Sequence, residues 1–122
     1  MAKEQTVCEL CEPDMMLFGD KHAYVRYDNN SLCAGHVLVI PRRHVSSFFD
    51  MNWEEKTSVL TLLDQAKADI ESRHAPDGYN IGVNVGRAGG QSRMHVHVHL
   101  IPRYNGDVSI PDGGIRCVLS GD

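Results

Sequence analysis

The chain has 122 residues, 42% of them hydrophobic and 23% charged, a balance typical of one soluble globular domain and not of a disordered chain. Twelve basic and sixteen acidic residues give a net charge of −4, which argues against duplex nucleic acid as the main partner. No apolar run reaches the ~20 residues of a membrane-spanning helix, and the N-terminus shows no signal-peptide core. We therefore expect one cytoplasmic domain over residues 1–122 that binds neither nucleic acid nor membrane.

The first half of the chain predicts two strands. Residues 1–20 show no periodic pattern, and we expect an irregular N-terminal segment there. Ala23–Tyr27 has the composition of a short strand and is followed by turn-forming residues. The β-branched run His36–Ile40, closed by a proline, indicates a buried strand. Ser46–Asp50 favours a short helical turn.

The most regular pattern predicts a helix over residues 52–74. Asn52 is a suitable N-cap, and Glu55 three residues later completes the pattern of a capping box. Apolar residues at helical spacing then form one face, namely Val59, Leu62, Leu63, Ala66 and Ile70. We interpret this helix as a packing element with a solvated outer face.

The second half of the chain adds two longer strands. These are Tyr79–Val85 and His95–Ile101, on either side of the glycine-rich segment Gly86–Ser92. The tail, residues 105–122, is rich in Gly, Pro and Asp apart from one short strand at Ile115–Leu119. Two strand connections are too short to hold a crossover helix, which favours antiparallel pairing. The sequence therefore predicts an α+β domain with a mostly antiparallel sheet, one main helix and a short helical turn.

Two of the four cysteines are three residues apart. Cys8 and Cys11 have the spacing that lets two thiolates bind one tetrahedral zinc ion, but a single pair supplies only half of a site. A redox pair is a rival interpretation, although no strand precedes the motif and no helical pattern follows it. A pair without either function is the third possibility. Cys33 and Cys117 are isolated, and we expect both to be small packing residues.

Three of the seven histidines alternate with apolar residues. On a strand, His95, His97 and His99 point to one face, and the intervening apolar residues point to the other. Three imidazoles on one face are costly to bury without a purpose. Metal ligation and nucleophilic or acid–base catalysis both suit such a face. The glycine-rich segment before them can direct backbone N–H groups at an anion, which suggests a phosphate held against an imidazole.

The segment around these histidines resembles the signature of the histidine triad (HIT) family, His-φ-His-φ-His-φ-φ with φ apolar. It reads Gln-Ser-Arg-Met-His-Val-His-Val-His-Leu-Ile-Pro-Arg over residues 91–103. Upstream, residues 78–84 match the strand that precedes the signature in the family. Residues 35–44 match its Gly-His-x-Leu-Val-x-Pro-Lys-x-His block. The match covers roughly residues 5–105 in the same order.

The resemblance implies a homodimer with a HIT-like α+β fold. Such proteins bind nucleoside phosphates and hydrolyse or transfer the nucleotidyl group of nucleoside-phosphate-X substrates, such as dinucleoside polyphosphates and nucleoside phosphoramidates. His97 corresponds to the nucleophile that forms a covalent nucleotidyl-histidine, and His99, His95 and His36 complete the implied catalytic set. The implied nucleotide- and phosphate-binding residues are Asp28, Asn84, Gly90, Gln91 and Ser92. Asp28 also fits a simple turn-forming role.

The resemblance also completes the metal site. Some family members carry an N-terminal Cys-x-x-Cys whose metal has two further histidine ligands. In this chain these would be His44 and His95, which with Cys8 and Cys11 make a closed structural zinc site. No organic cofactor is expected. The remaining histidines, His22 and His74, match nothing in the signature and are expected at the surface.

Two other functions stay open from the sequence. A nucleotide-binding module with vestigial catalysis would have the same pocket residues. A metalloenzyme would instead bind its ion with His95, His97 and His99.

Overall fold

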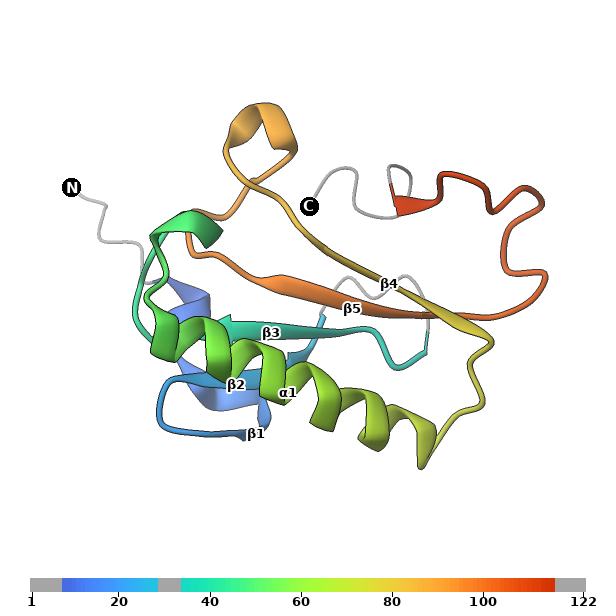
Figure 1. Cartoon of the computed structure of the whole chain (residues 1–122), viewed down its shortest axis with the longest axis horizontal. Helices are drawn as coiled ribbons and strands as arrows, with labels where there is room; N and C mark the ends of the chain where they lie inside the picture. The colour runs from blue at the N-terminus through green and yellow to red at the C-terminus, as the bar shows by residue number, and fades with distance from the viewer. Residues whose placement is uncertain (1–7, 29–33, 116–122) are drawn as a thin grey trace.

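The computed structural model describes residues 8–28 and 34–115, and an antiparallel five-stranded sheet forms its centre (Figure 1). The strands are β1 (Met16–Gly19), β2 (Ala23–Tyr27), β3 (Val37–Pro41), β4 (Gly78–Val83) and β5 (Val98–Arg103), in the spatial order β1-β2-β3-β5-β4. Helix α1 (Trp53–Glu71) crosses one face of the sheet and packs against β2, β3 and β5. The predicted α+β architecture is confirmed.

The two faces of the sheet carry different side chains. On the α1 face, alternate strand residues pack against the helix in the main core, which includes Val25, Val37, Val39, Val98, Leu100, Val59, Leu62, Ala66 and Ile70. On the opposite face, a smaller cluster joins Leu10 of the N-terminal segment to Tyr24, Leu38 and Ile40. The N-terminal segment, with its short 3₁₀ helices η2 (Glu9–Cys11) and η3 (Pro13–Met15), therefore covers part of the face that α1 leaves open.

Helix α1 begins as the capping pattern predicts. The Asn52 side chain accepts a hydrogen bond from the Glu55 N–H at 2.8 Å, and the Glu55 carboxylate accepts one from the Asn52 N–H at 2.9 Å. The same buried carboxylate accepts two hydrogen bonds from the guanidinium of Arg43 at 2.8 and 2.9 Å. The short helix η4 (Phe48–Asp50) falls within the predicted helical turn and comes between Arg43 and α1 along the chain. Glu55 thus ties the start of α1 to the segment that follows β3.

We expect Glu55→Ala to lower the free energy of unfolding by about 1–2 kcal/mol, because it removes a cap and a charge-assisted pair together. Glu55→Gln keeps the capping geometry and should cost less. The hydrogen bonds from Arg43 are the main cause that lowers the pKa of Glu55. The stability from this charge is therefore present above the ordinary pKa near 4.3 and is lost as the pH falls through the lowered value.

Chemical denaturation of wild type and both variants between pH 3 and pH 7 measures their free energies of unfolding. The difference in free energy of unfolding between wild type and Glu55→Gln should shrink toward zero at the acid end. A difference that is constant across this range would contradict the assignment.

The expectation that residues 1–20 are irregular is wrong in part, because β1 forms within them. The chain reverses at Asp20, whose carboxylate accepts hydrogen bonds from the N–H groups of His22 and Ala23. Gly19 permits the close approach of β1 to β2, since a Cβ there would lie 2.7 Å from the carbonyl oxygen of Ala23. β1 is a four-residue edge strand with mostly exposed side chains, so it has no burial pattern that a sequence could display.

Several predicted boundaries move by a few residues. The helix ends at Glu71 instead of residue 74. After Glu71 the N–H groups of residues 73 and 74 both donate to the carbonyl oxygen of Ile70 and form a closing turn. The strand predicted at His95–Ile101 begins only at Val98, because the N–H of Val96 bonds the carbonyl oxygen of Val45 beyond the end of β3. The predicted strand Ile115–Leu119, apart from its first residue, lies outside the described residues, as do Cys33 and Cys117.

Candidate active site and metal cluster

The antiparallel register brings the site residues to the face opposite α1. Val96, Val98 and Leu100 belong to the core under the helix, so the alternating histidines point the other way. All three are buried, with exposures of 4% or less. His36 immediately precedes β3, and its carbonyl oxygen accepts a hydrogen bond from the N–H of Asp28, just after β2. The expected common face of the three histidines is confirmed, and His36 and Asp28 join it.

A line of buried polar side chains runs across this face. Nε2 of His36 lies 3.0 Å from Nδ1 of His99 and 3.4 Å from a carboxylate oxygen of Asp28. The ring of His99 is 5.2 Å from the ring of His36 and 5.2 Å from the ring of His97, between centroids. Asp28 is 8% exposed. A carboxylate and three imidazoles in contact make a path along which a proton can be held or moved.

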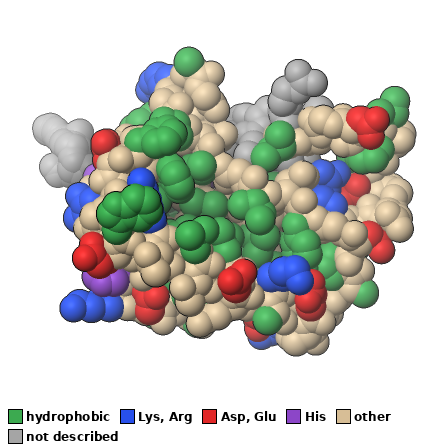
Figure 2. Space-filling view, viewed as in Figure 1, with side chains coloured by type: hydrophobic (Ala, Val, Ile, Leu, Met, Phe, Trp, Pro, Cys, Tyr) green, Lys and Arg blue, Asp and Glu red, His purple; other side chains and the backbone are tan. Residues whose placement is uncertain are grey.

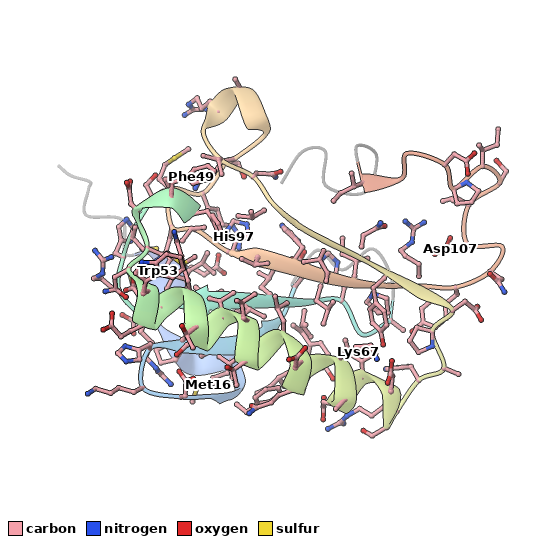
Figure 3. All side chains as sticks on the ribbon, viewed as in Figure 1. Met16, Phe49, Trp53, Lys67, His97 and Asp107 are labelled. Carbon is pink, nitrogen blue, oxygen red and sulfur yellow. The ribbon has the colours of Figure 1, made fainter. Side chains whose placement is uncertain are left out.

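One ring nitrogen of His97 is committed to the backbone. Nδ1 of His97 (labelled in Figure 3) lies 2.9 Å from the carbonyl oxygen of His95. A carbonyl oxygen only accepts hydrogen bonds, so Nδ1 carries the proton. In the neutral ring the lone pair is then on Nε2, which is the nitrogen that a nucleophilic histidine uses.

The ring of His95 faces a second cluster. Its Nε2 donates to the carbonyl oxygen of Pro41 at 2.7 Å, and its Nδ1 lies 3.5 Å from Sγ of Cys8 and 3.4 Å from Sγ of Cys11. Burial is the main cause that lowers the pKa of His95, which keeps its ring neutral near pH 7. His95 therefore meets His97 through its main-chain carbonyl and not through its ring.

The cysteine pair and two histidines form a compact donor set. Sγ of Cys11 lies 3.2 Å from Nδ1 of His44, and one donor atom from each of Cys8, Cys11, His44 and His95 lies within 4.8 Å of the others. Sulfur and nitrogen ligands of a tetrahedral zinc ion are about 3.6 Å apart. The three measured sulfur–nitrogen distances, 3.2 to 3.5 Å, are close to this value, so the donor set suits the ion. The Nε2 bond of His95 to Pro41 is the outer-shell contact that metal-bound histidines usually make.

The glycine-rich loop is held from inside by Gln91. This side chain is 3% exposed; its oxygen accepts from the N–H of Gly86 at 2.9 Å, and its nitrogen donates to the carbonyl oxygens of Ser46 and Arg93, both at 2.8 Å. Gly86 and Gly90 have φ values of 74° and 96°, which other residues rarely adopt. Gln91 shapes the loop, while Ser92 stays exposed on it.

Asn84 closes the loop from the end of β4. Its amide nitrogen lies 3.4 Å from the carbonyl oxygen of Gly90. The structure thus brings Asn84 to Gly90, two residues before Ser92, whereas the expected surface histidines His22 and His74 lie outside both clusters and are partly exposed.

Sequence reasoning missed Arg26, which is buried on the histidine side of β2. Tyr24 and Arg26 alternate with Ala23 and Val25, and the latter two lie in the core under α1. The same alternation continues to Asp28, so the period of this short strand is the sequence signal that places Arg26 on the same face as Asp28.

A family model described as the HIT domain matches residues 10–106. Because this match spans most of the 122 residues, the chain belongs to the HIT domain family. None of the helices in the described part of the chain is both long and apolar enough to cross a membrane.

Two curated relatives and one solved structure show the extent of the similarity. The AP-4-A phosphorylase of Mycobacterium tuberculosis is 37% identical over 76 residues, or 62% of this chain and 39% of that protein. The asymmetrical bis(5'-nucleosyl)-tetraphosphatase of Schizosaccharomyces pombe is 41% identical over 78 residues, or 64% of this chain and 43% of that protein. A Zn-bound histidine triad family protein from Mycobacterium smegmatis has a TM-score of 0.72 at 32% identity, over 82% of this chain and 77% of that one. The matched region thus spans less than half the length of both curated relatives.

Proposed function

We propose that this chain is a nucleotidyl hydrolase or transferase that attacks the α-phosphorus of nucleoside-phosphate-X substrates with His97. The observation that carries the proposal is the bond from Nδ1 of His97 to the His95 carbonyl, which leaves Nε2 as the nucleophile beside His99. Similarity to a phosphorylase and a tetraphosphatase of nucleotides supports the reaction class. Dinucleoside polyphosphates and nucleoside phosphoramidates are the proposed substrates.

The reaction has two displacements. In the first, the lone pair on Nε2 of His97 forms a bond to the α-phosphorus, the bond to X breaks, and X leaves with the electron pair and takes up a proton. The His95 carbonyl stabilises the Nδ1–H of the ring as it gains positive charge. In the second, water attacks the phosphorus, its proton passes to a neighbouring base, and the phosphorus–nitrogen bond breaks. A nucleoside monophosphate leaves and His97 is neutral again.

The surrounding residues have complementary proposed roles. His99 and His36, linked at 3.0 Å, deliver the proton to X and accept it from water, and Asp28 holds His36 or binds the ribose hydroxyls. Ser92, Asn84 and the N–H groups around Gly90 bind the phosphate oxygens. Gln91 keeps this loop in shape.

Trapping the covalent intermediate tests this proposal. The wild-type chain would be mixed with diadenosine tetraphosphate or adenosine phosphoramidate, quenched within milliseconds and digested for mass spectrometry under conditions that preserve phosphoramidate bonds. We expect an adenylyl group on the peptide that contains His97. Steady turnover with no modified peptide at any time would contradict the covalent mechanism.

Two other candidate functions make different predictions. A binding module would bind adenosine monophosphate tightly and turn over none of these substrates. A three-histidine metalloenzyme is not favoured, because the ring of His95 faces Cys8 and Cys11 and Nδ1 of His97 bonds a carbonyl.

We further propose that Cys8, Cys11, His44 and His95 bind a structural zinc ion. The fit of the donor set and the Zn-bound neighbour support it. When bound, the ion neutralises the two thiolates and joins the N-terminal segment to the histidine segment. Because thiolate ligands must stay reduced, we propose the cytoplasm as the site of action.

A homodimer is the proposed working unit. In the described part of the chain β4 pairs only with β5, so its outer edge is open. Exposed apolar side chains lie nearby on the α1 face, including Ile81 on β4 and Leu60 on α1, which are 54% and 65% exposed. Figure 2 shows hydrophobic side chains gathered over α1 and the neighbouring strand. An open edge beside apolar surface suits a second copy of the chain.

We expect Ile81→Lys to convert the dimer into a monomer, because it places a charge in the apolar interface. Light scattering coupled to size-exclusion chromatography measures the mass. Ile110→Lys is the matched control, since Ile110 is 77% exposed in the C-terminal segment, and it should stay dimeric. A monomeric wild type, or a dimeric Ile81→Lys, would refute this interface.

A further inference from the structure

Arg26 is a buried cation on the face that carries the histidines. Only 3% of its side chain is exposed. The sheet register places Arg26 opposite Leu38, and Leu38 opposite His99. Arg26 and His99 are therefore two strand spacings apart, roughly 10 Å between their backbones. Arg26 therefore lies in the same row of the sheet as His99, with Leu38 between them, on the face that carries the histidines.

The described contacts of Arg26 are long for a buried guanidinium. Nε lies 3.4 Å from the carbonyl oxygen of Tyr27, Nη2 lies 4.0 Å from a carboxylate oxygen of Glu9, and the Tyr24 hydroxyl is a further neighbour. By comparison, Arg43 and Arg103 approach their carboxylate partners to 2.8 Å. A guanidinium has five N–H donors, and burying it without close charged partners is costly. Its position is better explained if a stronger anion binds there.

Glu9 also lies near a second arginine, Arg93, at the end of the glycine-rich loop. Nη2 of Arg93 lies 3.8 Å from the other carboxylate oxygen of Glu9. Arg93 follows Ser92, and its carbonyl accepts a hydrogen bond from Gln91. The Glu9 side chain is 51% exposed, so dissolved anions can reach the two guanidinium groups beside it. A single carboxylate thus lies between two guanidinium groups at distances too long for strong hydrogen bonds to either.

We propose that Arg26 and Arg93 form a subsite for the phosphate groups of the substrate beyond the one that His97 attacks, and that Glu9 competes for this subsite. The inference rests on the proposed function and deepens it. A polyphosphate carries several charged groups along its length and can accept hydrogen bonds from both guanidinium groups at once. The subsite favours a polyphosphate leaving group and gives no advantage to an amine, so it selects phosphoanhydrides over phosphoramidates.

Binding of inorganic tripolyphosphate to the full chain tests the subsite without turnover. Calorimetry at fixed ionic strength would compare wild type with Arg93→Gln, Arg26→Gln and Glu9→Gln. We expect Kd to rise about tenfold in each arginine variant and to fall severalfold in Glu9→Gln, where the competing charge is removed. KM for diadenosine tetraphosphate should follow the same order, while kcat/KM for adenosine phosphoramidate should change less than twofold.

Arg73→Gln is the matched control, because it makes the same change in net charge at the end of α1 and should leave Kd unchanged. Zinc content and melting temperature are measured for every variant. Arg93 and Glu9 are partly exposed, so their variants carry the test even if Arg26→Gln does not fold. Weaker tripolyphosphate binding by Glu9→Gln would refute the subsite. It would also be refuted if all variants lost activity on both substrates equally and melted at a lower temperature, because Glu9 would then be a structural bridge. If only the proposed function is wrong, the wild-type chain turns over neither substrate, but the Kd values for tripolyphosphate still follow the order given above.

Discussion

Replacing His97 with alanine is expected to lower kcat on nucleoside-phosphate-X substrates by at least about 10³-fold. The variant lacks the proposed nucleophilic nitrogen. His95 also bonds a backbone carbonyl through one ring nitrogen, but its other ring nitrogen faces Cys8 and Cys11. His99 is close, at 5.2 Å between ring centroids, but its Nδ1 already faces His36. The measurement is the rate at which nucleoside monophosphate is released, monitored by chromatography.

The control for this variant is His22→Ala, which removes an imidazole outside both clusters and should keep kcat within twofold. Adenosine monophosphate should still bind to His97→Ala, because binding depends on the loop and on the other polar residues. Turnover of His97→Ala within tenfold of wild type would refute His97 as the nucleophile.

Loss of His44, a proposed zinc ligand, is expected to have the second large effect. We expect His44→Ala to bind less than a tenth of the wild-type zinc and to melt roughly 10 °C lower, because metal binding to a closed site contributes directly to folding. Activity should fall as well, although the proposed ion would have only a structural role. His95 is a proposed ligand through Nδ1, and its carbonyl fixes Nδ1 of His97. The ion would therefore influence the nucleophile through one residue.

Elemental analysis per chain and scanning calorimetry measure these changes. His74→Ala, at another partly exposed histidine, is the matched control and should keep both zinc and melting temperature. A chelator should lower the melting temperature of wild type, and added zinc should restore it. Purified wild type that contains no stoichiometric zinc and does not respond to added zinc would refute the metal site.

Local patterns in the sequence determined much of this protein. The period of two over residues 95–101 predicted that the three histidines lie opposite Val96, Val98 and Leu100. These three apolar residues do pack in the core under α1, although strand pairing begins only at Val98. The capping box at Asn52 and Glu55 was equally predictable, since both of its bonds connect residues three apart. β1 was not predictable, because four mostly exposed edge residues have no periodic burial to reveal.

Only the tertiary structure decided which groups meet. In the sequence Cys8, Cys11, His44 and His95 are separate features, and only the family resemblance predicts that they form one group. The fold places one donor atom of each within 4.8 Å of the others. Likewise, no local pattern shows that the amide of Gln91 turns inward to the loop backbone, or that Glu9 lies between Arg26 and Arg93. The physical reason is that backbone periodicity specifies the side to which a residue points. The neighbours on that side come from strand register and chain reversal over distances that no local pattern spans.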